Sequence, residues 1–255
     1  MVSRLIPVFC FLFAATQIQG IRTIKLLLFL LMLISVFPTG VARYLVAFAY
    51  IPLVLIYIPR LRNSSLFSAT LLVSILFIFP FLNQFRYFSG FDNLNFLPTA
   101  EFFYAAHFDA YENFASAIEV NQVSYGWQLL GAILFFIPRV FWPEKPVGSG
   151  YELAEQLGYT FNNISMPFLG EGYVNFGIIG TFFFATFLGY LMWKLDRNFS
   201  KNKLNLEQVN YSKAIYYYLI GALFFILRGD LLSSTAFVTA GLFSAFLVSF
   251  LCRRI

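Results

Sequence analysis

The chain has 255 residues, of which 60% are hydrophobic and only 11% are charged, and its mean hydropathy is +0.75. A typical soluble domain carries about 25% charged residues, so this composition excludes an ordinary soluble domain and indicates a membrane protein. The net charge of +5 is spread over many segments, which argues against nucleic-acid binding, and one histidine with two cysteines cannot build a His/Cys metal cluster.

Apolar runs that approach the length of a membrane crossing follow one another through the first third of the chain. A transmembrane helix needs about 20 mainly apolar residues, and it satisfies its backbone hydrogen bonds internally. Short basic loops separate the four predicted spans, which are Leu5–Ile18, Leu26–Phe37, Tyr44–Ile58 and Leu66–Leu82. The first run resembles a signal peptide in length, but it lacks a convincing cleavage site and is interpreted as a membrane segment.

Residues 83–170 are the most polar part of the chain and predict a large loop outside the membrane. The part that starts at Thr99 mixes aromatic and polar residues in the manner of an amphipathic surface helix. The run Trp127–Ile137 is too short for a full crossing, which favours a re-entrant or interfacial segment. The segment that follows, PRVFWPEKPVGSGYELAEQLG, is rich in proline, glycine, charged and aromatic residues, and we expect the chemistry of the protein there.

Three more spans are predicted after the loop, namely Tyr173–Trp193, Ala214–Leu227 and Leu231–Leu251. The fold class is therefore an all-α polytopic membrane protein with about seven transmembrane helices, forming a single membrane domain over residues 1–255. Cytoplasmic loops are enriched in lysine and arginine, so the basic segment 194–213 and the C-terminus are placed inside and the large loop outside. This orientation leaves the N-terminus outside beside Arg4, and we expect that an N-terminal part is missing.

Four cations on the outer side are candidates for an anion site. Arg139 and Lys145 lie on the proline-rich segment, and Arg86 and Arg228 lie at the outer ends of spans. Guanidinium groups bind phosphate through paired hydrogen bonds and lysine adds a point charge, so convergence of these side chains would suit a pyrophosphate at the headgroup level. The alternative is that each arginine extends to lipid phosphates and has no further role.

Three side chains are candidates for accepting a proton. Glu171 opens an apolar run, where a carboxylate either stabilises the N-terminus of a helix or, when desolvated, gains a raised pKa and serves as a base. His107 and Asp109 are two residues apart and would not share a helix face, but either could act as a base. A surface histidine without a task is an equally good interpretation of His107.

Two sequence blocks resemble the oligosaccharide repeat-unit polymerases of bacteria, the Wzy-like O-antigen polymerase family. The first block matches at Pro138, Arg139, Trp142, Pro143, Lys145 and Pro146. The second block matches at Gly170, Glu171, Tyr173, Asn175 and Gly177. HFDAYENF upstream and LRGD downstream add weaker support, and the resemblance covers roughly residues 83–252. Members of the family usually have more spans than this chain can hold, and the shortfall lies at the N-terminal side.

The resemblance implies a GT-C-like glycosyltransferase of the bacterial inner membrane that joins polyprenyl-pyrophosphate-linked oligosaccharides at the periplasmic face. One lipid-linked glycan would be the donor and a second the acceptor, and a protein that regulates chain length is a further expected partner. The pyrophosphate would be bound by Arg139, Lys145, Arg228 and Arg86. The acceptor would be activated by Glu171, His107 or Asp109. Trp142, Tyr151 and Tyr173 would stack on sugar or position the lipid, and Asn175 is a further candidate for binding the substrate. Because no Asp-x-Asp motif is present, we expect transfer without a metal or cofactor.

Two other functions are compatible with these residues. A ligase that transfers the glycan to a lipid acceptor would use the same donor, and the sequence does not separate it from a polymerase. A non-enzymatic transporter of lipid-linked glycans should carry charges within its spans. The predicted spans are nearly free of charge, which argues against transport.

Overall fold

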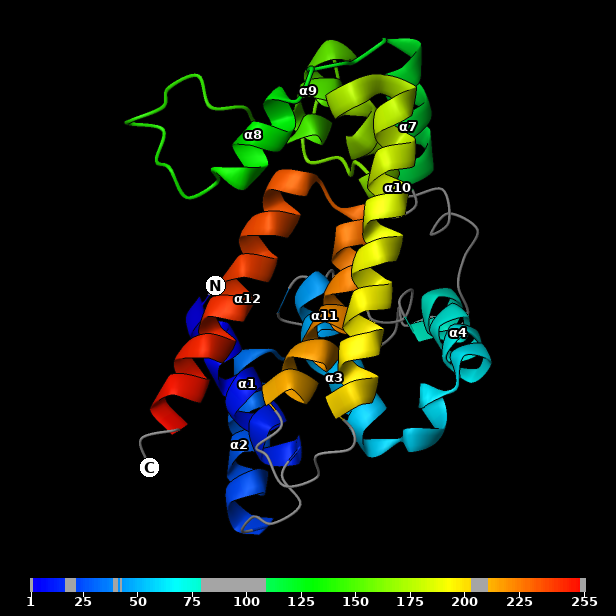
Figure 1. Cartoon of the computed structure of the whole chain (residues 1–255). Coiled ribbons are helices and arrows are strands. Elements are labelled where there is room, and N and C mark those ends of the chain that lie inside the picture. Colours follow the sequence, from blue (N-terminus) through cyan, green and yellow to red (C-terminus); the bar gives the residue numbers. More distant parts are fainter. Residues whose placement is uncertain are drawn as a thin grey trace, which may run out of the picture. The chain divides into compact units, whose positions relative to one another are not determined.

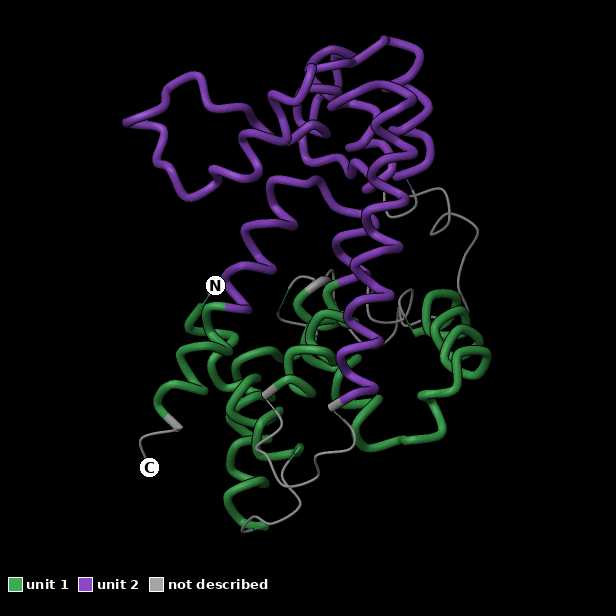
Figure 2. Tube along the Cα trace, in the orientation of Figure 1, with its two compact units in different colours: residues 1–105, 207–222, 243–255 green, residues 106–206, 223–242 purple. Residues whose placement is uncertain are grey.

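The computed structural model describes residues 2–16, 22–38, 41, 43–78, 109–202 and 211–252, and within these ranges the chain is helical without strands (Figure 1). It divides into two compact units (Figure 2). Unit 1 consists of Met1–Ala105, Glu207–Ala222 and Phe243–Ile255, and unit 2 consists of Ala106–Leu206 and Leu223–Leu242.

Two helices in the described ranges are long and apolar enough to cross a membrane, Phe168–Lys201 and Leu231–Leu251. Length and composition are the only criteria, so these helices weakly indicate a membrane protein. Shorter apolar helices cover Val2–Thr16, Leu45–Tyr57 and Ser64–Ile78. The prediction of an all-helical chain is thus confirmed for the described residues, whereas helices of spanning length match only two of the seven predicted crossings.

Unit 1 is built around aromatic contacts between helices that are distant in sequence. Its elements are α1 (Val2–Thr16), α2 (Arg22–Ser35), α3 (Arg43–Tyr57), η1 (Pro59–Arg62), α4 (Ser64–Val73), η2 (Ser74–Ile78), the first part of α11 (Tyr211–Arg228) and the last part of α12 (Leu231–Cys252). The buried ring of Tyr218 lies 5.0 Å from the ring of Phe9 and 5.4 Å from that of Phe48. A β-carbon at Gly221 would lie 2.7 Å from the carbonyl oxygen of Ala47, so glycine is what lets α11 pack closely on α3.

Unit 2 contains short helices that pack around a small apolar core. Its elements are α7 (Ala110–Glu119), α8 (Trp127–Ile133), α9 (Ser149–Gln156), α10 (Phe168–Asn202), the end of α11 and the first part of α12. The core comprises Ala117, Leu153, Ala154, Ile164, Met166 and Val174. The apolar run predicted over Trp127–Ile137 is helical only to Ile133, and the predicted amphipathic helix is described from Ala110 onward.

A break in α10 separates its first turns from its apolar part. Phe176 has φ −142° and ψ 21°, and Gly177 has φ 64° and ψ −154°, which is a conformation that favours glycine. A β-carbon at Gly172 would lie 2.6 Å from the carbonyl oxygen of Gly180, so the two parts of α10 cross with no room for a side chain. The predicted span Tyr173–Trp193 was wrong at its start, because the helix begins at Phe168 and breaks within that range.

Candidate functional site

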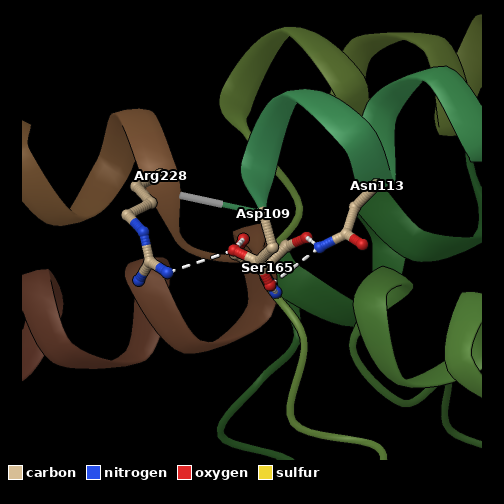
Figure 3. A network of polar contacts seen from close by, with 4 residues as sticks. All are labelled: Asp109, Asn113, Ser165 and Arg228. Carbon is tan, nitrogen blue, oxygen red and sulfur yellow. Dashed lines mark hydrogen bonds and ion pairs between the residues drawn. The ribbon is translucent and has the colours of Figure 1, made fainter. Parts of the chain in front are cut away.

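Two candidate residues that are distant in the sequence form an ion pair within unit 2. Asp109 stands immediately before α7, and Arg228 is the last residue of α11. Arg228 Nη2 lies 3.1 Å from Asp109 Oδ1 (Figure 3). The arginine side chain keeps 42% of its surface exposed, whereas that of Asp109 keeps 14%. The structure therefore places a guanidinium at the edge of the loop region, with a mostly buried carboxylate behind it.

The carboxylate of Asp109 is surrounded by hydrogen-bond donors. Oδ1 also accepts from the hydroxyl of Ser165, and Oδ2 accepts from Asn113 Nδ2 at 3.0 Å and from the backbone N–H of Ser165 at 3.3 Å. An ionised carboxylate has about four acceptor sites, and four donors address this one. This arrangement suits holding Arg228 in place better than accepting a proton from a substrate.

Glu171 lies in the first turn of α10 and is buried, with 1% of its surface exposed. Its Oε1 accepts hydrogen bonds from the hydroxyl of Ser149 and, at 2.8 Å, from the backbone N–H of Leu231. Ser149 opens α9 and Leu231 opens α12, so two helix N-termini converge on this carboxyl group. Among the described residues Oε2 has no hydrogen-bond partner.

Glu171 precedes the break at Phe176, so it lies outside the long apolar helix that follows the break. Burial raises the pKa of its carboxyl to about 8. The hydrogen bonds from Ser149 and Leu231 lower that pKa, and the negative charges of Asp230 and Glu152 raise it, but burial has the largest effect. The acid is therefore mainly protonated at neutral pH.

Both carboxyl groups bind residues that flank the short turn between α11 and α12. Asp109 pairs with Arg228 before the turn, and Glu171 receives the N–H of Leu231 after it. Within the turn, Asp230 Oδ1 accepts from the N–H of Ser233 at 2.8 Å and caps α12. The motif LRGD, which gave only weak support to the resemblance, is thus the point where the large loop, through Asp109, and the first turn of α10, through Glu171, are attached.

Arg139 and Lys145 hold the loop that carries them. Arg139 Nη1 donates to the carbonyl of Lys145 at 2.6 Å and Nη2 donates to that of Pro146 at 3.2 Å. Lys145 Nζ donates to the carbonyls of Phe135 and, at 3.0 Å, of Ile137. Both candidate phosphate ligands therefore have a structural role in the conformation described, which the spacing of the two cations did not indicate.

Tyr173 and Asn175 connect α10 to the segment before and within α8. The tyrosine is 6% exposed, and its hydroxyl donates to Asn121 Oδ1 at 3.3 Å. Asn175 is fully buried, donates to the carbonyl of Glu171 at 2.8 Å and accepts from the N–H of Leu129 at 2.7 Å. Neither side chain presents a surface on which a sugar could stack in this conformation.

Of the predicted site residues Trp142, Arg86 and His107, the structure describes only Trp142. Trp142 is half-buried, and its ring lies edge-to-face with that of Trp127 at a centroid distance of 5.4 Å. The positions of Arg86 and His107 lie outside the described residues, so their predicted roles remain predictions.

Sequence reasoning missed the polar residues that complete the two carboxyl networks, above all Ser149 and Ser165. Serine is common at helix ends and in turns, so neither was distinctive alone. The flanking glycines gave a signal for Ser149, because a β-carbon at Gly150 would collide with the carbonyl oxygen of Ile164, and one at Gly148 would lie 3.1 Å from Asp230 Oδ1. Such glycines mark a segment that other backbone and polar groups approach closely.

What the site can do follows from its own residues. Within the described ranges, no group of three His, Cys, Asp or Glu side chains could hold a metal ion. Comparisons of the chain with protein-family models, with curated proteins and with solved structures gave no match. A half-exposed guanidinium held by a carboxylate suits the binding of an anion at Arg228, and the N–H of Leu231, three residues further along the chain, donates to the buried protonated Glu171.

Proposed function

We propose that the chain is a membrane glycosyltransferase that polymerises polyprenyl-pyrophosphate-linked oligosaccharide repeat units. The resemblance to the Wzy-like O-antigen polymerases is the source of this proposal. The observation that supports it best is the attachment of the Arg228 turn to the large loop through Asp109 and to the first turn of α10 through Glu171. That attachment pairs a cation, 42% exposed, with Asp109 of HFDAYENF, and it ties the turn after this cation to Glu171 of the second block.

In this reaction the acceptor hydroxyl oxygen forms a bond to the anomeric carbon of the donor, and the bond from that carbon to the pyrophosphate oxygen breaks. Negative charge develops on the leaving pyrophosphate, and Arg228 stabilises it through charge-assisted hydrogen bonds. Asp109 and Glu171 are positioning residues that act through Arg228 and its turn. The proton of the acceptor hydroxyl passes to a base, for which His107 remains the predicted candidate.

The same proposal includes seven membrane crossings and a location in the bacterial inner membrane with the large loop on the periplasmic side. Support comes from the apolar helices α10 and α12 and from the basic residues after Trp193. To test the orientation, single cysteines are introduced at Tyr125, which is 87% exposed, and at Lys201, and intact spheroplasts are treated with a membrane-impermeant thiol reagent. We expect labelling of the first site only. Labelling of the first site only after permeabilisation would overturn the orientation.

The function is tested with the full chain in nanodiscs and a polyprenyl-pyrophosphate-linked repeat unit as both donor and acceptor. We expect a ladder of polymer lengths from the wild type and a loss of rate of about 100-fold or more in Arg228→Gln. Arg197→Gln is the matched control, because Arg197 lies over the ring of Trp193 at 5.2 Å, away from the loop. An undiminished ladder from Arg228→Gln would contradict the assignment, and single transfer to a lipid acceptor would favour a ligase.

A further inference from the structure

The loop 134–148, which connects α8 and α9, exposes large apolar side chains. Phe136 is 66% exposed, Val140 86% and Phe141 81%. The loop stands out from the rest of unit 2 and does not fold back on it (Figure 2). Contiguous exposed apolar side chains of this size mark an interaction surface. Lipid contact along a spanning helix does not account for them, because these residues belong to no helix of spanning length.

The conformation of this loop is held by its own polar groups. Arg139 and Lys145 donate hydrogen bonds to four carbonyl groups of the loop, and Pro138, Pro143 and Pro146 restrict its backbone. Pro146 is buried and lies where a β-carbon of Gly131 would be, so the loop is anchored on α8. A surface fixed in this way loses little conformational entropy when it docks.

The chemistry of the loop identifies what covers it. Next to the apolar residues lie the cations Arg139 and Lys145, with Glu144 as the one acidic residue of the loop, and Trp142 packs against Trp127. Exposed phenylalanine, interfacial tryptophan and an excess of positive charge together are typical of segments that lie at the membrane–water boundary. Anionic headgroups complement the cations, and acyl chains complement the apolar side chains.

We infer that the loop 134–148 is a membrane-docking element that inserts Phe136, Val140 and Phe141 into the interface of a bilayer containing anionic lipid. Arg139 and Lys145 hold the shape of the loop and lie at the level of the lipid phosphates. This inference does not depend on glycosyl transfer, so its outcome is distinct from that of the proposed function.

The test uses the full chain with Cys10 and Cys252 replaced by serine and a single cysteine at Val140 that carries an environment-sensitive fluorophore. The protein is reconstituted in nanodiscs of equal parts phosphatidylcholine and phosphatidylglycerol, with a nitroxide quencher near the top of the acyl chains. We expect quenching at Val140 to exceed that at a labelled Tyr111→Cys control severalfold. Tyr111 is a suitable control because it lies on α7 in the same unit and is 83% exposed.

Three further arms decide the outcome. Phe141→Ser should reduce quenching at Val140 severalfold, whereas Tyr111→Ser should leave it unchanged. Nanodiscs of phosphatidylcholine alone should also reduce it, and equal quenching in both lipids would overturn the inferred preference for anionic lipid. Quenching at Val140 no greater than at Tyr111, or a fluorescence change that requires two copies of the chain per nanodisc, would overturn docking on lipid.

Discussion

Replacement of Glu171 by glutamine should make the stability of the protein less dependent on pH. The carboxyl is buried and has no cation among its hydrogen-bond partners, and its pKa rises from 4.5 to about 8 on folding. Below pH 4.5 both states carry the proton, and the full stability is present. As the pH rises toward 8, the unfolded state loses the proton and the folded state keeps it, so the free energy of unfolding falls.

The size of this effect follows from the same pKa difference. A pKa that differs by one between the two states corresponds to about 1.4 kcal/mol, so the wild type should lose about 4 kcal/mol of stability between pH 5 and pH 9 through this group. Glutamine is nearly isosteric, and its carbonyl oxygen can still accept from Ser149 and Leu231. Glu171→Gln should therefore resemble the wild type at pH 5 and be clearly more stable at pH 9.

The assay is the apparent melting temperature of the full chain in detergent, followed by intrinsic fluorescence over this pH range. Glu155→Gln is the matched control, because Glu155 is exposed on α9 and its replacement removes one negative charge without touching the buried site. We expect Glu155→Gln to follow the wild type at every pH. Parallel curves for wild type and Glu171→Gln from pH 5 to pH 9 would refute the reasoning that a desolvated acid lies at this position.

Three further substitutions test the packing and the loop. Gly172→Ala should lower the melting temperature, because its β-carbon would lie 2.6 Å from the carbonyl oxygen of Gly180 in the same helix. Gly189→Ala is the control: its β-carbon would meet open space, so the variant should be as stable as the wild type or gain up to about 1 kcal/mol from helix propensity. Equal melting temperatures for the two variants would contradict the close crossing within α10. Lys145→Met removes two hydrogen bonds to loop carbonyls and should speed proteolysis within 134–148 severalfold. Unchanged cleavage rates would show that these hydrogen bonds do not hold the loop. Asp109→Asn removes the carboxylate charge that pairs with Arg228, so it should weaken binding of a pyrophosphate probe about tenfold in titration calorimetry. Undiminished affinity would argue against a positioning role.

The helices that could be predicted are those whose boundaries follow from composition alone. The predicted span Leu231–Leu251 agrees with α12 to within one residue, and Ala214–Leu227 falls within α11. Long apolar runs that end at Arg228, Gly229 and Asp230 leave few alternatives to a helix on each side of a tight turn. The break in α10 was harder to predict, because a glycine in an apolar run usually serves packing and only the folded chain shows that Gly177 has a positive φ.

The candidate site could be predicted as a set of residues but not as a geometry. Asp109 and Arg228 are 119 residues apart, and nothing in their local patterns indicates that they pair. Glu171 was expected at a helix start, which is confirmed, but its complete burial depends on α9 and α12, which the sequence does not place around it. Arg139 and Lys145 were interpreted as phosphate ligands because the sequence shows their charge. It does not show that their side chains donate hydrogen bonds to backbone carbonyls of the same loop.

If α10 crosses a membrane as proposed, the break at Phe176 and Gly177 limits how thick that membrane can be. The apolar helix from Ile178 to Trp193 rises about 1.5 Å per residue, so it extends about 24 Å, whereas the hydrocarbon core of a typical bilayer is about 30 Å thick. A bilayer around this segment would have to thin locally by several ångströms, or the break at Phe176 and Gly177 would have to lie below the bilayer surface. Such a mismatch would favour residence in thinner membranes and would concentrate bilayer strain beside Glu171, where the large loop is attached.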